Sequence, residues 1–502
     1  MQCKQVISLM VLTTWLMGFA GFPSFAQDLA EFEKKVTEFT LDNGLKFIVV
    51  ERREAPVVSF MTYADVGSVD EKKGITGLAH LFEHLAFKGT TTVGATNHEA
   101  EKAAFEKMDQ LFLEIKSERR KGERADKARL EELQMQFEEH QKEAEKYIVP
   151  HEFDEAIAKA GGVGLNADTA WDRTRYYYSL PSNKLELWMC LESDRFLNPV
   201  LREFYKERDV VAEERRLSEN NPISRLVEDF FATAFKAHPY GEPVIGHMSD
   251  IQTITRQEAE AFFDQYYRAS NLTIAIVGDV DPKQVREFAE TYFGRLPKGE
   301  KPEPVETIEP EQQGERRCSI VAQSQPIVII GYHRPGINHP DNAGFDAITD
   351  ILGVGRTSRL YKSMVRDQKI AIAAEALSIT GAMIKYPNLF IFLSVPAKGH
   401  TNEENEQALY AEIEKLKTEL VTPEELEKAK TRTRADLIRQ LDSNSGLAAQ
   451  LAFYEAVTFD WRNLFHQLDQ IDQVTAEDIR RVANTYFTNK NKTVGTIVTE
   501  EE

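Results

Sequence analysis

The stretch Gly77-Leu-Ala-His80-Leu-Phe-Glu83-His84-Leu-Ala-Phe carries two histidines four residues apart. In a helix this spacing places both imidazoles on one face, about one turn apart, so they can bind one zinc ion at about 2 Å from each nitrogen. Glu83 lies close to the same face, where its carboxylate can take a proton from a water on the metal. The stretch therefore predicts a zinc helix with His80 and His84 as ligands and Glu83 as the catalytic base.

H-x-x-E-H is the signature of inverted zinc peptidases. Five positions with two free ones also occur by chance, and the alternative is a pair of histidines that only pack or hydrogen-bond. Leu81, Phe82 and Leu85 point away from the histidine face and are expected to bury the helix. The rest of the chain has to decide between the two interpretations.

The composition is that of a soluble globular protein. The chain has 502 residues, enough for two or more cores, with 42% hydrophobic and 28% charged residues. Its net charge of -20 argues against nucleic acid as a partner, because binding phosphates needs clustered Lys and Arg. Cys190 and Cys318 are too few to form a zinc site and are expected to be buried free thiols.

Residues 1–26 have the pattern of a secretory signal peptide. Lys4 precedes the apolar run 6–19, and the small-x-small triplet Ser24-Phe25-Ala26 follows. The alternative is a membrane anchor, which the short apolar run disfavours. We expect cleavage after the triplet, export to the periplasm or the cell exterior, and no membrane span in the mature protein.

Two stretches of the chain match at a constant offset of 220 residues. Residues 251–280 contain a helical segment, an Asn and an apolar strand, and residues 471–500 repeat this order without a gap. Thr255 and Thr475 both suit a helix N-cap with acidic residues in the following turn. This agreement indicates an internal duplication.

The segment 296–314 is rich in Pro, Glu and Lys and predicts an exposed linker. It separates an N-terminal zinc-binding half, 27–295, from a C-terminal half, 315–502. The charged region 98–150 predicts an inserted helical hairpin, broken at Lys121-Gly122. This hairpin is either a solvated decoration or a lid or docking arm.

Strands alternate with long helices in both halves. Phe39–Phe47 reads as a strand, an Asn-Gly turn and a strand, and Val57–Ala64 as a further strand. Residues 326–332 are the counterpart of the latter in the second half. The predicted class is α+β, with helices packed on the sheets of each half.

Further motifs accompany the zinc stretch in a fixed order. Gly77–Thr90 resembles the signature of the pitrilysin–insulinase–mitochondrial processing peptidase family. Leu165–Thr169, His238–Gly241 and Val277–Pro282 match it as well, and the similarity runs from about Phe39 to Val498. The resemblance implies two homologous α/β-roll halves with mainly antiparallel sheets in a clam-shell-like arrangement.

The family's third zinc ligand is a Glu on a later helix. Matching the segment 207–215 places this ligand at Glu214 and the family's second, upstream Glu at Glu207, which we expect to assist catalysis. Glu213 is the nearest alternative ligand, about 100° away around the helix. The separation of His84 from Glu214 is longer than usual for the family, and the hairpin accounts for the excess. The second half lacks H-x-x-E-H, so we expect one zinc ion per chain.

The resemblance also implies how peptides bind. A substrate strand would add to the edge strand that contains Asn166 and Ala167, although Asn166 also suits an ordinary strand end. Arg366 matches a substrate-binding Arg of the second half, but the family's Tyr is replaced at 372–373. We therefore expect a paralogous zinc-less partner that supplies an Arg/Tyr pair, or a homodimer.

These observations together predict a zinc-dependent endopeptidase that hydrolyses peptides or unfolded protein segments. The alternative is a non-catalytic scaffold or peptide-binding subunit of the same fold.

Overall fold

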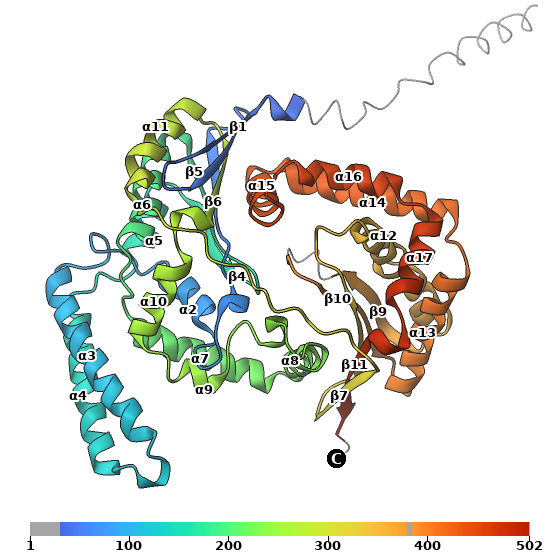
Figure 1. Cartoon of the computed structure of the whole chain (residues 1–502), viewed down its shortest axis with the longest axis horizontal. Coiled ribbons are helices and arrows are strands. Elements are labelled where there is room, and N and C mark those ends of the chain that lie inside the picture. Colours follow the sequence, from blue (N-terminus) through green and yellow to red (C-terminus); the bar gives the residue numbers. More distant parts are fainter. Residues whose placement is uncertain (1–30, 379–383, 501–502) are drawn as a thin grey trace, which may run out of the picture.

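The computed structural model describes residues 31–378 and 384–500 (Figure 1). The predicted signal peptide lies outside the described residues. Among the helices that the structure describes, none combines the length and the apolar character that crossing a bilayer requires.

The N-terminal half is built on a six-stranded sheet. In spatial order its strands are β1 (Val36–Thr40), β2 (Lys46–Glu51), β6 (Leu272–Gly278), β3 (Val57–Ala64), β5 (Thr174–Pro181) and β4 (Val163–Thr169). β1 and β2 form the predicted hairpin, with Phe39 opposite Phe47. β2 and β6 are parallel and the other neighbours are antiparallel.

The C-terminal half repeats this topology with one strand fewer. In spatial order its strands are β7 (Arg316–Ala322), β11 (Lys492–Thr499), β8 (Ile327–Arg334), β10 (Asn388–Pro396) and β9 (Ala371–Ser378). β7 and β11 are parallel, as β2 and β6 are, and β8 occupies the place of β3. The predicted α+β class and the predicted correspondence of β3 and β8 are both confirmed.

The duplication extends to individual hydrogen bonds. α10 (Arg256–Tyr266) and α17 (Ala476–Tyr486) each begin with a capping box, formed by Thr255 in the first half and Thr475 in the second. Past each helix an Asn amide donates to the carbonyl of the helix's last Tyr, at 2.9 and 2.8 Å. The 220-residue offset found in the sequence therefore corresponds to a repeated structural unit.

Each half has its own apolar core between its sheet and its helices. The helices of the N-terminal half include α2 (Leu78–Leu85), α5 (Glu152–Lys159), α6 (Leu185–Leu197), α7 (Phe204–Asn220), α9 (Met248–Ile251) and α11 (Pro282–Tyr292). Those of the C-terminal half include α12 (Asn342–Gly353), α13 (Asn402–Thr418), α14 (Pro423–Asp442) and α16 (Asn463–Gln473). Cys190 lies on the outward face of α6 and is exposed, so the expectation of a buried thiol is wrong there.

One helix from each half packs on the sheet of the other half (Figure 1). α15 (Asn444–Thr458), from the C-terminal half, packs on β3 and β6 of the first sheet. α8 (Pro222–Ala234), from the N-terminal half, packs on β7 and β11 of the second sheet. The apolar clusters at these two contacts include Ile48, Met61, Ala275, Leu447 and Leu451 in the first, and Leu226, Phe230, Ile320, Ile329 and Ile497 in the second.

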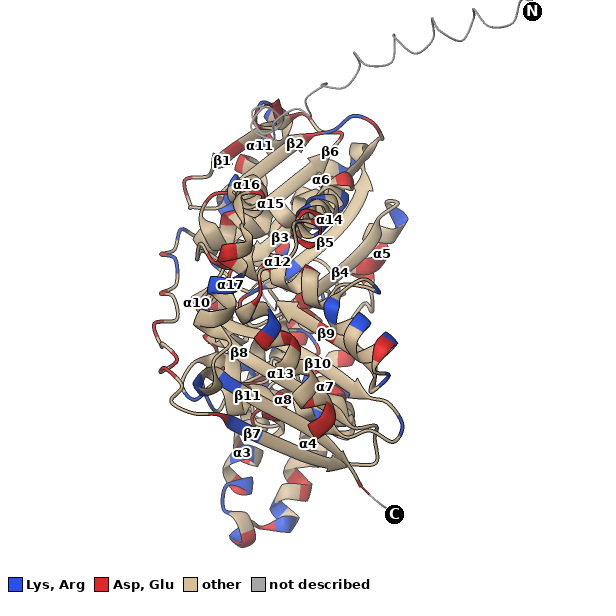
Figure 2. Ribbon diagram, turned by 90° about the vertical axis from the view of Figure 1, so that its right-hand side faces the viewer, with Lys and Arg blue, Asp and Glu red and all other residues tan. Residues whose placement is uncertain are grey.

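Two long antiparallel helices, α3 (His98–Arg119) and α4 (Lys127–Glu145), project from the N-terminal half as a hairpin (Figure 1). Its surface carries charges of both signs (Figure 2). Partway along the hairpin, the rings of Phe112 and Phe137 lie 4.9 and 5.1 Å from that of Tyr205 on α7. The hairpin is thus anchored on the helix that also carries Glu207 and Glu214.

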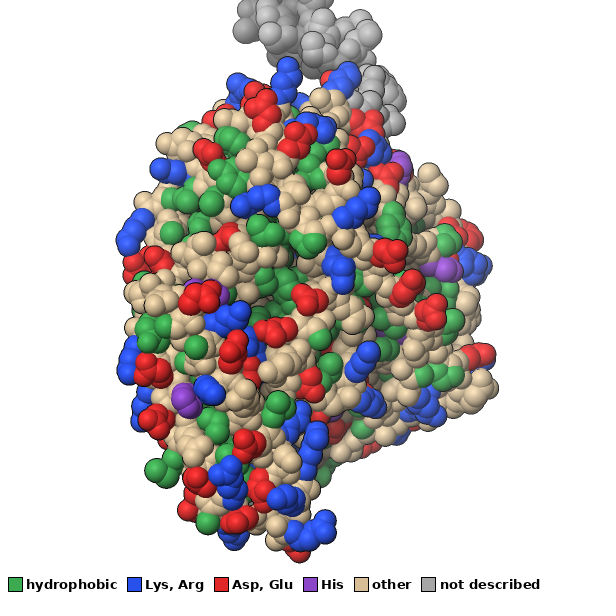
Figure 3. Space-filling model, turned by 60° about the vertical axis from the view of Figure 1, so that its left-hand side comes forward, with side chains coloured by type: hydrophobic (Ala, Val, Ile, Leu, Met, Phe, Trp, Pro, Cys, Tyr) green, Lys and Arg blue, Asp and Glu red, His purple; other side chains and the backbone are tan. Residues whose placement is uncertain are grey.

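The segment 296–314 contains neither helix nor strand, as expected for a linker. It is nevertheless held at two places. The Glu309 carboxylate accepts from the backbone N–H groups of residues 236–238, and the buried Gln312 amide donates to the carbonyl of Lys492. Acidic and basic side chains are interspersed on the face shown in Figure 3, which lacks a broad basic patch.

Candidate metal centre

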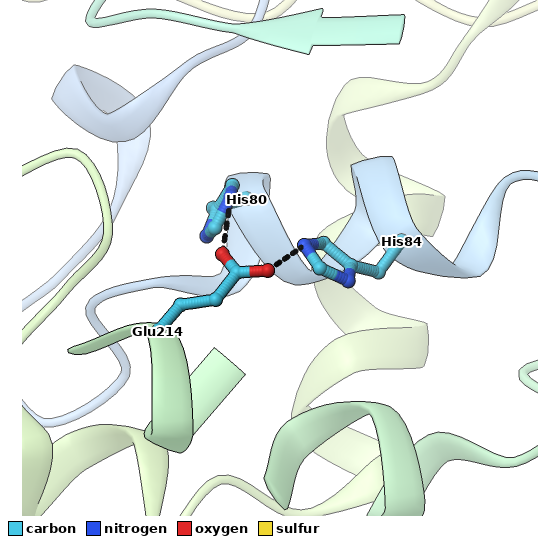
Figure 4. A group of neighbouring side chains, drawn as sticks. All are labelled: His80, His84 and Glu214. Atoms are coloured by element: carbon cyan, nitrogen blue, oxygen red, sulfur yellow. Dashed lines mark ion pairs between the residues drawn. The ribbon is translucent and has the colours of Figure 1, made fainter. Parts of the chain in front are cut away.

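Two helices bring His80, His84 and Glu214 together (Figure 4). Nε2 of His80 lies 3.7 Å from Oε2 of Glu214, and Nε2 of His84 lies 3.6 Å from Oε1 of the same carboxylate. The two imidazole centroids are 4.9 Å apart. Within the described residues, this is the one group of three or more His, Cys, Asp or Glu side chains whose ligand atoms lie close enough together to hold a metal ion.

The histidine helix α2 is fixed by its apolar side. Leu81, Phe82 and Leu85 are buried in the core of the N-terminal half, as predicted. The helix begins after Gly77, which has a φ of 95° and whose missing Cβ would lie 2.7 Å from the carbonyl oxygen of Ile245. Only glycine fits this left-handed turn against a neighbouring backbone. The polar face of α2 is left free to present its histidines.

The two neighbouring acids of α7 point in different directions. Glu214 faces the histidines, whereas Glu213 is exposed and forms an ion pair with Arg216. Glu207 lies two turns before Glu214 on the same side of the helix, because seven residues make two helical turns. The structure thus brings both predicted acids of α7 to α2.

Glu207 is not one of the three proposed ligands. Its carboxylate lies near Nδ1 of His84, the ring nitrogen that faces away from Glu214. Its Oε2 lies 3.4 Å from Nδ1 of His84, and its Oε1 lies 2.6 Å from Nζ of Lys88. Burial alone would raise the pKa of Glu207, but the hydrogen bonds from His84 and Lys88 outweigh it and lower the pKa. The same contact raises the pKa of His84 against the effect of burial.

His80 is in a different environment. Burial, aided by the neighbouring His84, lowers its pKa to about 4, so its imidazole is neutral at pH 7. A neutral imidazole is the form that binds a metal ion. Its buried Nδ1 has no hydrogen-bond partner among the described residues.

Glu83 lies beside the edge strand β4. Burial raises the pKa of its carboxyl group, and the nearby hydroxyl of Thr169, the last residue of β4, opposes that rise. A carboxylate whose pKa is moved toward neutrality is suited to accept and return a proton at neutral pH. Glu83 does not belong to the group of three ligand atoms, which leaves it free for this task.

The donor set fits zinc. Two ligand atoms at the usual zinc distances around a tetrahedral ion lie roughly 3.3 Å apart. The nitrogen–oxygen separations of 3.7 and 3.6 Å are close to this value, and all three ligand atoms lie within 4.8 Å of one another. Two imidazoles and one carboxylate are a ligand set typical of catalytic zinc, with a fourth position for water or substrate.

The predicted substrate residues lie in two places. β4 is the outermost strand of its sheet, as expected. Asn166 is exposed there and donates to the Tyr177 hydroxyl at 3.2 Å, whereas the Ala167 side chain is buried. Arg366 lies in the C-terminal half, where it is exposed and donates to Asp367 at 2.7 Å, so the structure does not bring it to the histidines.

Two residues near the centre were missed by sequence reasoning. Lys88 follows His84 by four residues, but α2 ends at Leu85, so helical spacing gives no signal for it. Glu71 gave no signal either, because it lies in the loop before α2. Burial raises the pKa of Glu71 to about 8, while hydrogen bonds from the N–H groups of Ala79 and Gly77 oppose that rise.

The fold and the donor set define a duplicated α+β protein with an inverted zinc motif, and comparison with known proteins identifies the family. The family model described as Insulinase (Peptidase family M16) matches residues 46–109 and 141–247. The model described as Peptidase M16 inactive domain matches residues 253–433. The chain belongs to the insulinase family of peptidases, M16. The unmatched stretch between the first two segments falls within the α3–α4 hairpin.

Relatives with similar sequences are named as zinc proteases. The zinc protease PqqE of Helicobacter pylori is 30% identical over 97% of each chain. The uncharacterized zinc protease ML0855 of Mycobacterium leprae is 25% identical over 92% of each chain. These names support a function of the peptidase type and the presence of zinc in the family.

Solved structures share the fold. A protease from Helicobacter pylori has a TM-score of 0.77 at 29% identity, covering 92% of this chain and 99% of that one. The first half of the periplasmic protease PqqL from Escherichia coli has a TM-score of 0.67 at 18% identity, covering 93% and 92%.

Proposed function

We propose that the protein is a zinc-dependent endopeptidase that cleaves peptides or unfolded protein segments. The observation that carries the proposal is the meeting of His80, His84 and Glu214 with Glu83 alongside them. His80 and His84 would hold the ion through their Nε2 atoms and Glu214 through its carboxylate.

Zinc, when bound, makes water acidic enough to react at neutral pH and polarises the scissile carbonyl. The remaining steps belong to the protein. Glu83 takes a proton from the attacking water and returns it to the leaving amine nitrogen, for which its raised pKa suits it. Glu207 orients the His84 ring by accepting from Nδ1, so that Nε2 points toward Glu214.

The substrate would bind as an added strand. β4 lies at the outside of its sheet and packs against α2, with its last residue, Thr169, near Glu83. A peptide paired with β4 through its backbone would therefore pass the proposed base. We propose that Asn166 and Ala167 contribute to this pairing and that Arg366 binds substrate from the second half.

We further propose that a partner completes the enzyme. The Tyr expected after Arg366 is replaced by Ile372 and Ala373, so a paralogous zinc-less subunit would supply an Arg/Tyr pair, or a second copy would contribute to a homodimer. Export to the periplasm or cell exterior is proposed from the pattern of residues 1–26, and the name of the periplasmic protease PqqL supports it.

The test is a measurement of zinc content together with peptide cleavage, on the chain alone and with a co-expressed paralogous subunit. We expect about one zinc per chain, cleavage by the wild type, and a loss of at least about 100-fold in kcat for Glu83→Gln with zinc retained. Glu213→Gln, on the exposed side of α7, is the matched control and should behave as wild type. Zinc binding without cleavage in any assembly would favour the scaffold or peptide-binding alternative, and absence of zinc binding would overturn the proposal.

A further inference from the structure

The helix that carries the histidines begins in a way that sequence rules for helix starts do not anticipate. α2 is capped at Gly77, which has no side chain to accept hydrogen bonds from the first turn. A helix usually satisfies these N–H groups with a Ser, Thr, Asp or Asn at the N-cap, and often with a Glu three residues later that reaches back to the cap. Here the position three residues after the cap is His80, one of the proposed zinc ligands.

Both capping positions are therefore occupied by residues with other tasks. Gly77 is required for the left-handed turn against Ile245, and His80 is required for the metal. The first-turn N–H groups of this buried helix end still need acceptors, because an unpaired buried N–H group is destabilising.

Glu71 supplies both missing acceptors from outside the helix. Its Oε1 accepts from the backbone N–H of Ala79 at 2.7 Å, and its Oε2 accepts from the backbone N–H of Gly77 at 2.8 Å. The first bond replaces the one that an N-cap side chain would make, and the second replaces the return bond of a capping box.

The loop between Glu71 and α2 is held as well. Oδ2 of Asp250 accepts from the backbone N–H of Gly74 at 2.9 Å and from the Thr76 hydroxyl at 2.8 Å. The loop 72–76 is therefore held by Asp250, and the start of α2 that follows it is held by Glu71.

We infer that Glu71 is a positioning residue for the metal centre: it substitutes for both parts of a capping box and so fixes the turn of α2 that presents His80. This inference rests on the proposed function, because it takes α2 to be the metal-binding helix. Glu71 touches neither the substrate nor the ligand atoms and acts through the backbone of residues 77–79.

The test compares zinc affinity in Glu71→Ala and wild type by competition with a fluorescent zinc chelator. Loss of groups that support metal ligands typically weakens metal binding about 10- to 100-fold, and we expect a weakening of at least about 10-fold. Glu71→Gln keeps one acceptor oxygen and should fall between the two. Thr475→Ala, which removes the cap of α17 in the other half, is the matched control and should bind zinc as wild type does.

A second readout separates this inference from the proposed function. In zinc-free wild type, hydrogen exchange of the Ala79 amide should be slow, and in Glu71→Ala it should be at least about 10-fold faster, because its acceptor is gone. Wild-type zinc affinity in a folded Glu71→Ala variant would overturn the inference. If the variants do not fold, rapid exchange of the Ala79 amide in the wild type would overturn it, and slow exchange would support it. If the wild type binds no zinc, the proposed function is wrong. The exchange measurement would still show whether Glu71 caps α2.

Discussion

Oε2 of Glu207 lies 3.4 Å from Nδ1 of His84, while Nε2 of the same ring faces Glu214 at 3.6 Å. The imidazole is thus held between two carboxylates of one helix, and each contacts a different nitrogen. Lys88 contacts the second oxygen of Glu207 at 2.6 Å and keeps that carboxylate in place. This geometry supports the proposal that Glu207 orients His84, whereas the family resemblance predicted that Glu207 assists catalysis.

Replacing Glu207 by Ala should weaken zinc binding by about 10- to 100-fold, because partners of metal-bound histidines contribute this much. The dissociation constant is measured by chelator competition at fixed pH. Glu213→Ala should leave it unchanged. An unchanged affinity in Glu207→Ala would show that the His84 contact does not support the metal.

Replacing Glu214 by Ala should remove a direct ligand, so the zinc content after dialysis should fall from about one ion per chain to near zero. Glu213→Ala should keep its zinc, since its carboxylate is exposed and paired with Arg216. Metal analysis of both purified variants shows which of the two glutamates is needed to hold zinc. Loss of zinc from Glu213→Ala alone would reverse the assignment of the third ligand.

The exchange of α8 and α15 predicts that the two halves unfold together. Leu451 on α15 is fully buried against the first sheet, so Leu451→Ala should lower the free energy of unfolding by about 2–5 kcal/mol. Ile438→Ala, at an exposed position of α14, should change it by less than about 0.5 kcal/mol. Urea unfolding followed by fluorescence should show one transition, and two separate transitions would contradict the coupling.

Burial lowers the pKa of His238 to about 4, below the unfolded value near 6.5. The unfolded chain therefore binds this proton more tightly, and stability present above about pH 6.5 is lost as the pH falls toward 4. The loss attributable to His238 is up to about 3 kcal/mol. His238→Asn keeps an acceptor for the Tyr240 N–H and should reduce the pH dependence of unfolding between these limits, with the exposed His151→Asn as control. An equal slope in both variants would exclude His238 as a source of acid lability.

Local rules were sufficient to predict a large part of the fold. The Asn43-Gly44 turn predicted the β1–β2 hairpin, because Asn-Gly between two apolar runs is a strong hairpin signal. Thr255 and Thr475 predicted the starts of the two repeated helices, because Thr followed by acidic residues in the next turn is typical of a helix N-terminus. Helical periodicity likewise placed Glu207 and Glu214 on one face of α7.

Other features depend on contacts between distant segments. Nothing in the apolar pattern of α8 or α15 specifies which sheet the helix covers, so their exchange between halves was not foreseen. The two bonds from Glu71 depend on how its loop folds back over α2, which no spacing rule describes. Arg366 was placed by family resemblance, and in the structure it is exposed beside Asp367.

The exchanged helices also constrain the order in which the chain acquires its structure during synthesis. All six strands of the first sheet have been made once β6 is complete, yet Ile48 and Met61 on that sheet remain without their cover until α15 emerges much later. The nascent N-terminal half therefore exposes an apolar face from the completion of β6, which ends at Gly278, until α15, Asn444–Thr458, has been made. A cell that makes this protein has to shield that face, or keep the chain unfolded, until almost the whole polypeptide has left the ribosome.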